Sequence, residues 1–253
     1  MGIEPKLLPH RNRPKGIYLL PNLLTTAALF AGFYAIVAAM KGDFDIAAVA
    51  VFIAMVADGL DGRVARMTNT QTAFGAEYDS LSDMVAFAVA PALLVYSWML
   101  FSLGKLGWLI AFVYTAATAL RLARFNTQTQ DEDKRYFQGL PCPSAAAVVT
   151  SMVWIGCSYH LSGLLVIFIA AVITFCVAAL MVSRVRYYSF KQIDFKGKVP
   201  FVMIVILVLM IAAVAIAPPE MLFLVFLSYA FSGPLMTLWQ LRKMRKKKSN
   251  NKN

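Results

Sequence analysis

The chain has 253 residues, of which 60% are hydrophobic and 15% are charged, and its mean hydropathy is +0.66. Soluble domains usually carry about 25% charged residues, so this composition excludes an ordinary soluble globular domain and indicates a polytopic membrane protein. The formal net charge of +11 would suit a nucleic-acid-binding protein. However, the basic tail directly follows an apolar stretch, where it serves better as an orientation signal that also attracts anionic lipid headgroups. We expect no nucleic-acid partner.

Apolar stretches recur along the whole chain. A helix that crosses a hydrocarbon core of about 30 Å needs roughly 20 residues. In chain order we expect transmembrane helices over residues 19–40, 45–66, 74–100, 106–125, 143–159, 163–183, 199–217 and 220–240. The sequence therefore predicts an all-α fold with a single membrane-embedded catalytic domain over residues 1–253, which includes a basic N-terminal segment, 1–16, and a basic tail, 241–253.

The distribution of lysine and arginine predicts the orientation of these helices. Basic residues in short loops collect on the cytoplasmic side of a membrane. If the N-terminus is cytoplasmic and there are eight spans, Lys41 and Lys105 are the two of the 24 basic residues on the opposite side. An odd number of spans would place basic residues on both sides of the membrane. We therefore predict a multi-pass protein of the inner membrane with both termini in the cytoplasm.

Four aspartates lie in the stretch DGLDGRVARMTNTQTAFGAEYDSLSD, residues 58–83. Residues three or four apart share one face of a helix, so Asp58 and Asp61 share a face of one predicted helix, and Asp79 and Asp83 share a face of the next. The connection between these helices is short, so the two carboxylate faces can meet. Four carboxylates so close would repel one another or take up protons unless cations neutralised them.

The ligand type and the small residues beside it indicate phosphate chemistry. Oxygen ligands without histidine or cysteine suit Mg²⁺ or Mn²⁺, and two such ions can clamp phosphate oxygens. Gly62, Ala65 and Gly75 lie on the same faces and leave a recess for a flat group such as a nucleotide base. Alternatively, the aspartates cap helix ends or pair with Arg63 and Arg66. Four carboxylates on convergent faces favour a functional site at the cytoplasmic surface.

The same stretch resembles the signature of the CDP-alcohol phosphotransferase family, D-x2-D-G-x2-A-R-x8-G-x3-D-x3-D. The fixed positions correspond to Asp58, Asp61, Gly62, Ala65, Arg66, Gly75, Asp79 and Asp83. Members of that family are integral membrane enzymes that transfer a phosphatidyl or related group from a CDP-linked donor to an alcohol and release CMP.

This resemblance implies a role for each matched residue. Asp58, Asp61 and Asp79 would bind two Mg²⁺ or Mn²⁺ ions, and Asp83 would complete that site and act as the general base on the acceptor hydroxyl. The cytidine of the donor would enter past the small residues Gly62, Ala65 and Gly75, with Arg66 at or near the nucleotide. Outside the motif, Asn22 either faces the nucleotide or caps the first helix.

Beyond the motif, the chain resembles the membrane-integral phosphatidylserine synthases of bacteria. The similar segments are LLPNLLTTAALFAGFYAI, FGAEYDSLSDMVAFAVAPALLVY, ALRLARFN and FQGLPCPSAAA. The resemblance implies CDP-diacylglycerol as the donor, L-serine as the acceptor and a homodimeric enzyme.

A serine substrate needs a cationic partner for its carboxylate. Arg121 and Arg124 lie at the predicted cytoplasmic end of the fourth helix, and arginine can bind a carboxylate or phosphate through two hydrogen bonds. Alternatively, the two arginines only anchor the helix at the cytoplasmic side of the membrane, following the positive-inside rule. Asn126 would add a neutral hydrogen bond to serine. The segment FQGLPCP, residues 137–143, either shapes the floor of the acceptor pocket or simply starts the next helix.

Three other functions stay open from the sequence. The first is the same reaction with glycerol phosphate, inositol phosphate or choline as the acceptor. The second, an aspartate-rich membrane prenyltransferase, is expected to carry two separated aspartate motifs, whereas this chain has one compact cluster. The third, a divalent-cation transporter, would place acidic residues through the depth of the bilayer, whereas these four aspartates are predicted near one surface.

Overall fold

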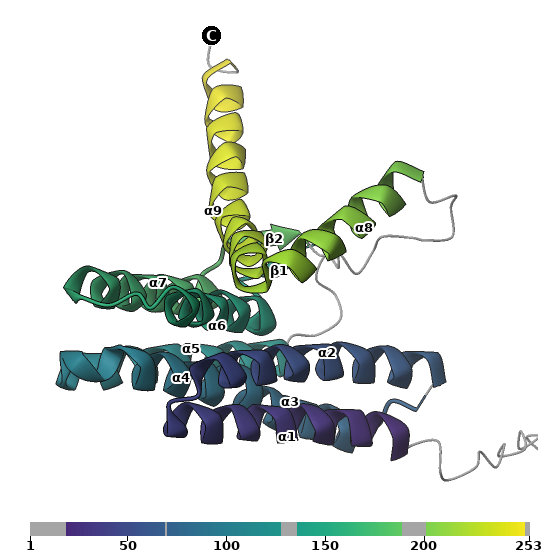
Figure 1. The fold of residues 1–253 in the computed structure, drawn as a ribbon. Helices are drawn as coiled ribbons and strands as arrows, with labels where there is room; N and C mark the ends of the chain where they lie inside the picture. The colour runs from purple at the N-terminus through teal and green to yellow at the C-terminus, as the bar shows by residue number, and fades with distance from the viewer. Residues whose placement is uncertain (1–18, 69, 128–135, 189–200, 251–253) are drawn as a thin grey trace, which may run out of the picture.

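The computed structural model describes residues 19–68, 70–127, 136–188 and 201–250 (Figure 1). The expected N-terminal segment 1–16 lies outside these residues. Of the expected tail, 241–253, the helical backbone is described as far as residue 250.

Helical segments occur at all eight expected places in the described part of the chain. They are α1 (Leu19–Lys41), α2 (Phe44–Thr68), α3 (Ala73–Asp83) continued by η1 (Met84–Val89) and α4 (Ala90–Trp98), α5 (Lys105–Thr127), α6 (Cys142–Ser158), α7 (Leu164–Val182), α8 (Phe201–Ile216) and α9 (Pro218–Asn250). A short 3₁₀ segment, η2 (Leu100–Leu103), precedes α5. The prediction of an all-α architecture is confirmed, with one departure in a pair of short strands.

The two strands join segments far apart in the sequence. β1 (Tyr136–Gln138) pairs antiparallel with β2 (Arg186–Tyr188). The backbone N–H of Gly139 donates to Val185 O, and that of Leu140 donates to Leu180 O. A Cβ on Gly139 would collide with the carbonyl of Met181, and its φ of +79° favours glycine. This ribbon, made of β1 and β2, holds in place the residues that lead into α6.

Small residues bring α1, α2 and η1 close together. Alanines line the buried faces of α1 and α2, among them Ala28, Ala31, Ala35, Ala47, Ala50 and Ala54. Gly32 of α1 lies against η1, where a Cβ would be 2.7 Å from the Cα of Ala86. Small residues of this kind let membrane helices approach at close distance.

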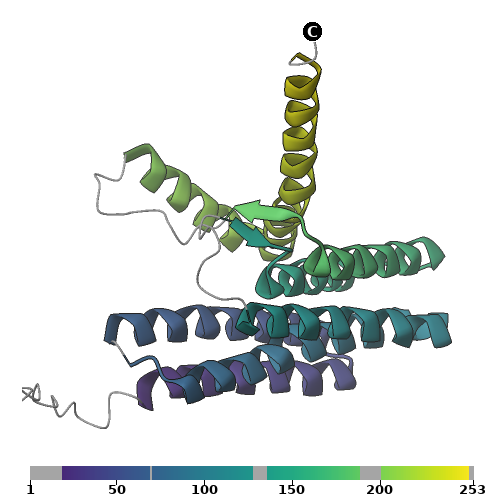
Figure 2. The same cartoon turned by 180° about the vertical axis from the view of Figure 1, so that it is seen from behind.

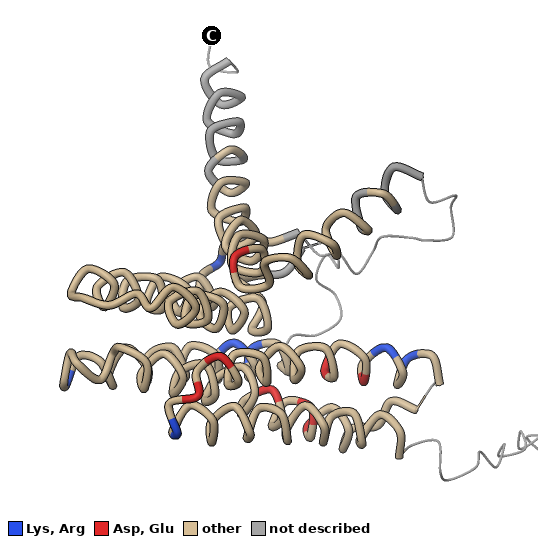
Figure 3. Tube along the Cα trace, in the orientation of Figure 1, with Lys and Arg blue, Asp and Glu red and all other residues tan. Residues whose placement is uncertain are grey.

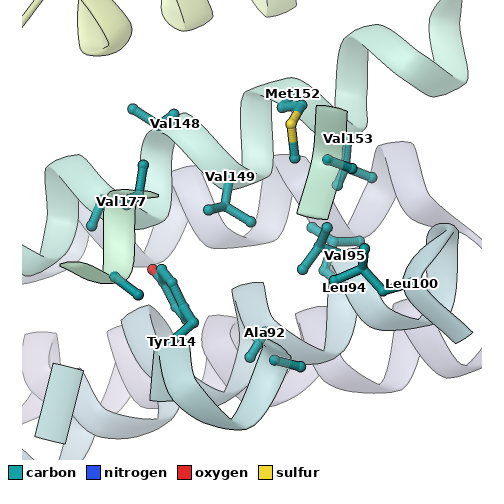
Figure 4. Packing of buried hydrophobic residues seen from close by; sticks show 14 of the residues in the cluster. Ala92, Leu94, Val95, Leu100, Tyr114, Val148, Val149, Met152, Val153 and Val177 are labelled. Atoms are coloured by element: carbon teal, nitrogen blue, oxygen red, sulfur yellow. The ribbon is translucent and has the colours of Figure 1, made fainter. Parts of the chain in front are cut away.

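The helix that carries Asp79 and Asp83 changes its winding immediately after Asp83. The π-helical segment η1 widens the turn there, and the Oη of Tyr114 on α5 donates a 3.0 Å hydrogen bond to the carbonyl of Phe87. Segments of this type are often found at functional sites. Beyond η1, buried side chains of α4, α5, α6 and α7 form the main core, including Val95, Tyr114 and Val149 (Figure 4).

The arrangement of the helices supports a membrane protein with several crossings. In both views α1–α7 lie side by side with similar axes, whereas α9 extends across that direction (Figures 1 and 2). Charged residues are scarce along α1–α7 (Figure 3). Within the described residues, five segments are long and apolar enough to span a membrane: Leu19–Lys41, Ala73–Trp98, Lys105–Thr127, Leu164–Val182 and Pro218–Thr237. Eight crossings and the cytoplasmic position of both termini stay predictions.

The part of α9 around Ala230 and Gly233 packs against the β1–β2 strand pair, and α9 also contacts α6. The Oη of Tyr187 on β2 donates a 2.9 Å hydrogen bond to the carbonyl of Ala230. A Cβ on Gly233 would collide with the Tyr187 ring. Glycine is therefore required where α9 crosses the strand, and the ribbon links α9 to the bundle.

Candidate active site

Three aspartates from two helices meet at one point. One carboxylate oxygen each from Asp58, Asp61 and Asp79 lies within 4.8 Å of the others. Asp58 and Asp61 belong to the last turns of α2, and Asp79 belongs to α3. The start of α3 is set by Thr72, whose Oγ1 accepts a 3.0 Å hydrogen bond from the N–H of Gly75. The structure confirms the expected meeting of the two carboxylate faces.

Asp83 lies one helical turn beyond Asp79. The group of three carboxylates does not extend to it. Asp83 lines the same cavity as the other three aspartates and has Asp58, Asp79 and Asp61 as its charged neighbours.

The cluster of three carboxylates suits a hard divalent cation as its ligand. Three convergent oxygens from separate carboxylates are the donors that Mg²⁺ and Mn²⁺ prefer. Without a cation the mutual repulsion of these charges in a poorly hydrated site would be costly. The donor set therefore suits the metal that the motif implies.

The aspartates open into a cavity of about 630 Å³ between α1, α2, α3, α5 and the start of α6. This volume lies within the range of about 300–1,000 Å³ that is usual for sites of small molecules and cofactors. Ten of the residues expected at the site line it, namely Asn22, Asp58, Asp61, Gly62, Ala65, Arg66, Gly75, Asp79, Asp83 and Arg121.

The two glycines of the motif create space in different ways. A Cβ on Gly62 would meet no atom within 4 Å, so this residue faces open space. A Cβ on Gly75 would lie 3.1 Å from Thr72 Oγ1 and 3.5 Å from Asn22 Oδ1. A Cβ at Gly75 would therefore be tight against the capping oxygen of Thr72 and in ordinary contact with Asn22. Asn22 lies inside α1, which begins at Leu19, so it lines the cavity and does not cap the helix.

The three residues expected to bind serine have different surroundings. Arg121 lines the cavity, and its Nη1 donates a 3.3 Å hydrogen bond to the Sγ of Cys142. Its Nε is buried and has no hydrogen-bond partner among the described residues. Arg124 and Asn126 are not among the described residues that line the cavity. Arg124 Nη2 donates to Gln138 Oε1 on β1, and Asn126 Nδ2 donates a 3.0 Å bond to Ser80 Oγ on α3.

Some cavity residues were not expected from the sequence. Thr25 of α1 lines the cavity and contacts Asp61, and the available signal was a polar pair, Thr25 and Thr26, within an apolar helix. Cys142 also lines the cavity, between Pro141 and Pro143. The segment 137–143 leads into α6, which begins at Cys142, and its last three residues form part of the cavity wall. Its role as the floor of an acceptor pocket stays a prediction.

Comparison with known proteins agrees with the motif. Residues 18–176 match the CDP-alcohol phosphatidyltransferase family. A CDP-diacylglycerol–serine O-phosphatidyltransferase of Helicobacter pylori is 34% identical over 230 residues, which cover 90% of this chain and 94% of the relative.

Two further relatives come from a Gram-positive bacterium and an archaeon. The CDP-diacylglycerol–serine O-phosphatidyltransferase of Bacillus subtilis is 31% identical over 173 residues, 68% of this chain and 92% of the relative. An archaetidylserine synthase of Methanothermobacter thermautotrophicus is 34% identical over 170 residues, 66% of this chain and 69% of the relative.

Proposed function

Because the chain belongs to the CDP-alcohol phosphatidyltransferase family, we propose that it transfers the phosphatidyl group of CDP-diacylglycerol to the hydroxyl of L-serine and releases CMP. The relatives in Helicobacter, Bacillus and Methanothermobacter support serine as the acceptor, since their names share serine and differ in the lipid part. The observation that carries the proposal is a single cavity lined by four aspartates and by Arg121.

We assign metal binding at the donor phosphates to the aspartates. Asp58, Asp61 and Asp79 would hold Mg²⁺ or Mn²⁺, with Asp83 completing a two-ion site. Such ions, when bound, stabilise negative charge on the phosphate oxygens of the donor. The carboxylate oxygens of Asp58, Asp61 and Asp79 lie within 4.8 Å of one another, which supports the assignment of these three residues.

Asp83 is the proposed general base. The serine hydroxyl has a pKa far above 7, so its proton must pass to a group within hydrogen-bonding reach. As the hydroxyl oxygen bonds to the β-phosphorus of CDP-diacylglycerol, the bond from that phosphorus to the bridging oxygen breaks and CMP leaves. The proton of the hydroxyl moves to the Asp83 carboxylate. No covalent enzyme intermediate is required.

The donor nucleotide would bind on the side of α1, α2 and the start of α3. Gly62 faces open space in the cavity, and Gly75 and Asn22 both line it. We assign the cytidine to this recess, beside Ala65. Arg66, at the end of α2, supplies positive charge for the nucleotide phosphate.

The acceptor would bind on the opposite wall, near α5 and α6. Arg121 has a buried Nε with no partner among the described residues, and its Nη1 contacts a thiol, which is a weak acceptor. A substrate carboxylate would accept a hydrogen bond from this Nε–H. Arg124 and Asn126 lie within one to two turns of Arg121, and we assign them a supporting part in serine binding through their contacts with Gln138 and Ser80.

The position of the cavity fits a reaction between a lipid and a water-soluble amino acid. The basic residues near the ends of α2 and α5 favour a cytoplasmic position for the site. We place the protein in the inner membrane with this site at the cytoplasmic face, and propose that it works as a homodimer. A labelling assay on intact and permeabilised cells, with single cysteines introduced near either helix end, tests the orientation.

A direct assay decides the acceptor. Purified protein is incubated with CDP-diacylglycerol, Mn²⁺ or Mg²⁺, and one labelled alcohol at a time: L-serine, glycerol phosphate, inositol phosphate or choline. We expect phosphatidylserine and CMP in equal amounts from serine, and no activity after chelation of the metal. Formation of another lipid in place of phosphatidylserine would assign a different acceptor within the family.

A further inference from the structure

A threonine outside the aspartate motif contacts one of the proposed metal ligands. Thr25 of α1 is 4% exposed, and its Oγ1 lies 2.6 Å from Oδ2 of Asp61 on α2. Asp61 is also 4% exposed and is the most buried of the four aspartates. The contact therefore lies within the wall of the cavity, shielded from water.

The proton of the Thr25 hydroxyl has two possible acceptors. The carbonyl oxygen of Pro21 lies 3.1 Å away, and Asp61 Oδ2 lies 2.6 Å away. Hydrogen bonds from a hydroxyl to a carboxylate are about 2.5 to 2.7 Å long and roughly twice as strong as those between neutral groups. The geometry thus favours donation from Thr25 to Asp61 when Asp61 is ionised.

Thr25 is itself held in place from α3. Ser82 is 2% exposed, and its Oγ donates a 3.1 Å hydrogen bond to the backbone carbonyl of Thr25. Ser82 immediately precedes Asp83. Thr25 consequently links α1 to both helices that carry the aspartates.

We infer that Thr25 is a positioning residue that orients Asp61 for binding of the divalent cation. This inference rests on the proposed metal site. With Oδ2 bound to the threonine hydroxyl, the Asp61 carboxylate cannot rotate freely, and it stays beside Asp58 and Asp79 despite their mutual repulsion. Hydrogen bonds that orient metal ligands typically change metal affinity or activity by about 10- to 100-fold when they are removed.

Binding of Mn²⁺ alone tests this role without substrate. The purified full-length protein is titrated with Mn²⁺, and the free ion is measured by electron paramagnetic resonance. Thr25→Val keeps the shape of the side chain but removes the hydroxyl, so we expect Mn²⁺ affinity to fall by about tenfold or more. Thr25→Ala, which adds no methyl group in place of the hydroxyl, should show the same loss. Thr25→Ser keeps the hydroxyl and should retain wild-type affinity.

Thr26→Val is the matched control. Thr26 is the next residue in α1, but its Oγ1 donates to the carbonyl of Asn22 and contacts the Oη of Tyr78, at 2.7 and 3.0 Å. This variant should bind Mn²⁺ as the wild type does. In the transfer assay, Thr25→Val should need more Mn²⁺ for half-maximal rate and recover rate at high Mn²⁺, which a general loss of folded protein would not produce.

The outcomes separate the two proposals. Wild-type Mn²⁺ affinity in Thr25→Val or Thr25→Ala would overturn the positioning role and leave the transferase function standing, and so would a loss in Thr25→Ser equal to that in Thr25→Val. Wild-type protein that binds no Mn²⁺ would overturn the metal assignment itself, and with it this inference.

Discussion

The spacing of residues in the sequence predicts one wall of the cavity better than the other. On the donor side, Asp58, Asp61 and Asp79 come together where their spacing in the sequence places them. On the acceptor side, Arg121 and Arg124 have the same three-residue relation, yet Arg121 lines the cavity and Arg124 contacts Gln138 on β1. Helical spacing brings both arginines near the site, but later parts of the chain supply their contacts: Cys142 at the start of α6 for Arg121, and Gln138 on β1 for Arg124.

The largest effect is expected from the aspartates. Asp83→Asn keeps the size of the side chain but removes the base, so turnover should fall by about 10²- to 10⁴-fold. Binding of CDP-diacylglycerol, measured by equilibrium binding of a labelled donor, should persist. Asp45→Asn, in the first turn of α2 and far from the cavity end of that helix, is the control and should retain activity. Near-normal turnover of Asp83→Asn would remove Asp83 from the role of base.

A smaller and more selective effect is expected for Arg121. Hydrogen bonds to charged groups contribute about 1.5–3 kcal/mol, so Arg121→Ala should raise the KM for serine by about tenfold or more. The KM for CDP-diacylglycerol should change much less. Steady-state kinetics with each substrate varied in turn measures both, and Lys105→Ala at the other end of α5 serves as the control. The reverse pattern would move Arg121 to the donor side.

The smallest effect is expected for the pair of Arg124 and Gln138. Each single change to alanine should lower kcat/KM for serine by about two- to fivefold, because the contact supports the position of α5 and β1. Residues in direct contact give non-additive effects, so the double variant should be little worse than either single one. Additive losses in the double-mutant cycle would mean that Arg124 contacts the substrate independently of β1.

Much of the fold followed from patterns of short range. Apolar stretches long enough for a membrane helix marked all eight helical segments in the described part of the chain. The π-helical turn after Asp83 was not predicted, because it depends on packing against Tyr114 of α5. The strand pair was not predicted either, since three-residue strands leave little periodicity and their pairing joins residues about fifty positions apart.

By itself the sequence determined the meeting of three aspartates: the helical period and the short turn between α2 and α3 suffice to bring Asp58, Asp61 and Asp79 together. The tertiary structure decided which other residues surround that centre. Thr25 meets Asp61 across 36 positions, and Arg121 faces the cavity while Arg124 is held by Gln138. Such contacts depend on how whole helices pack against one another. The spacing of residues within one helix does not determine that packing.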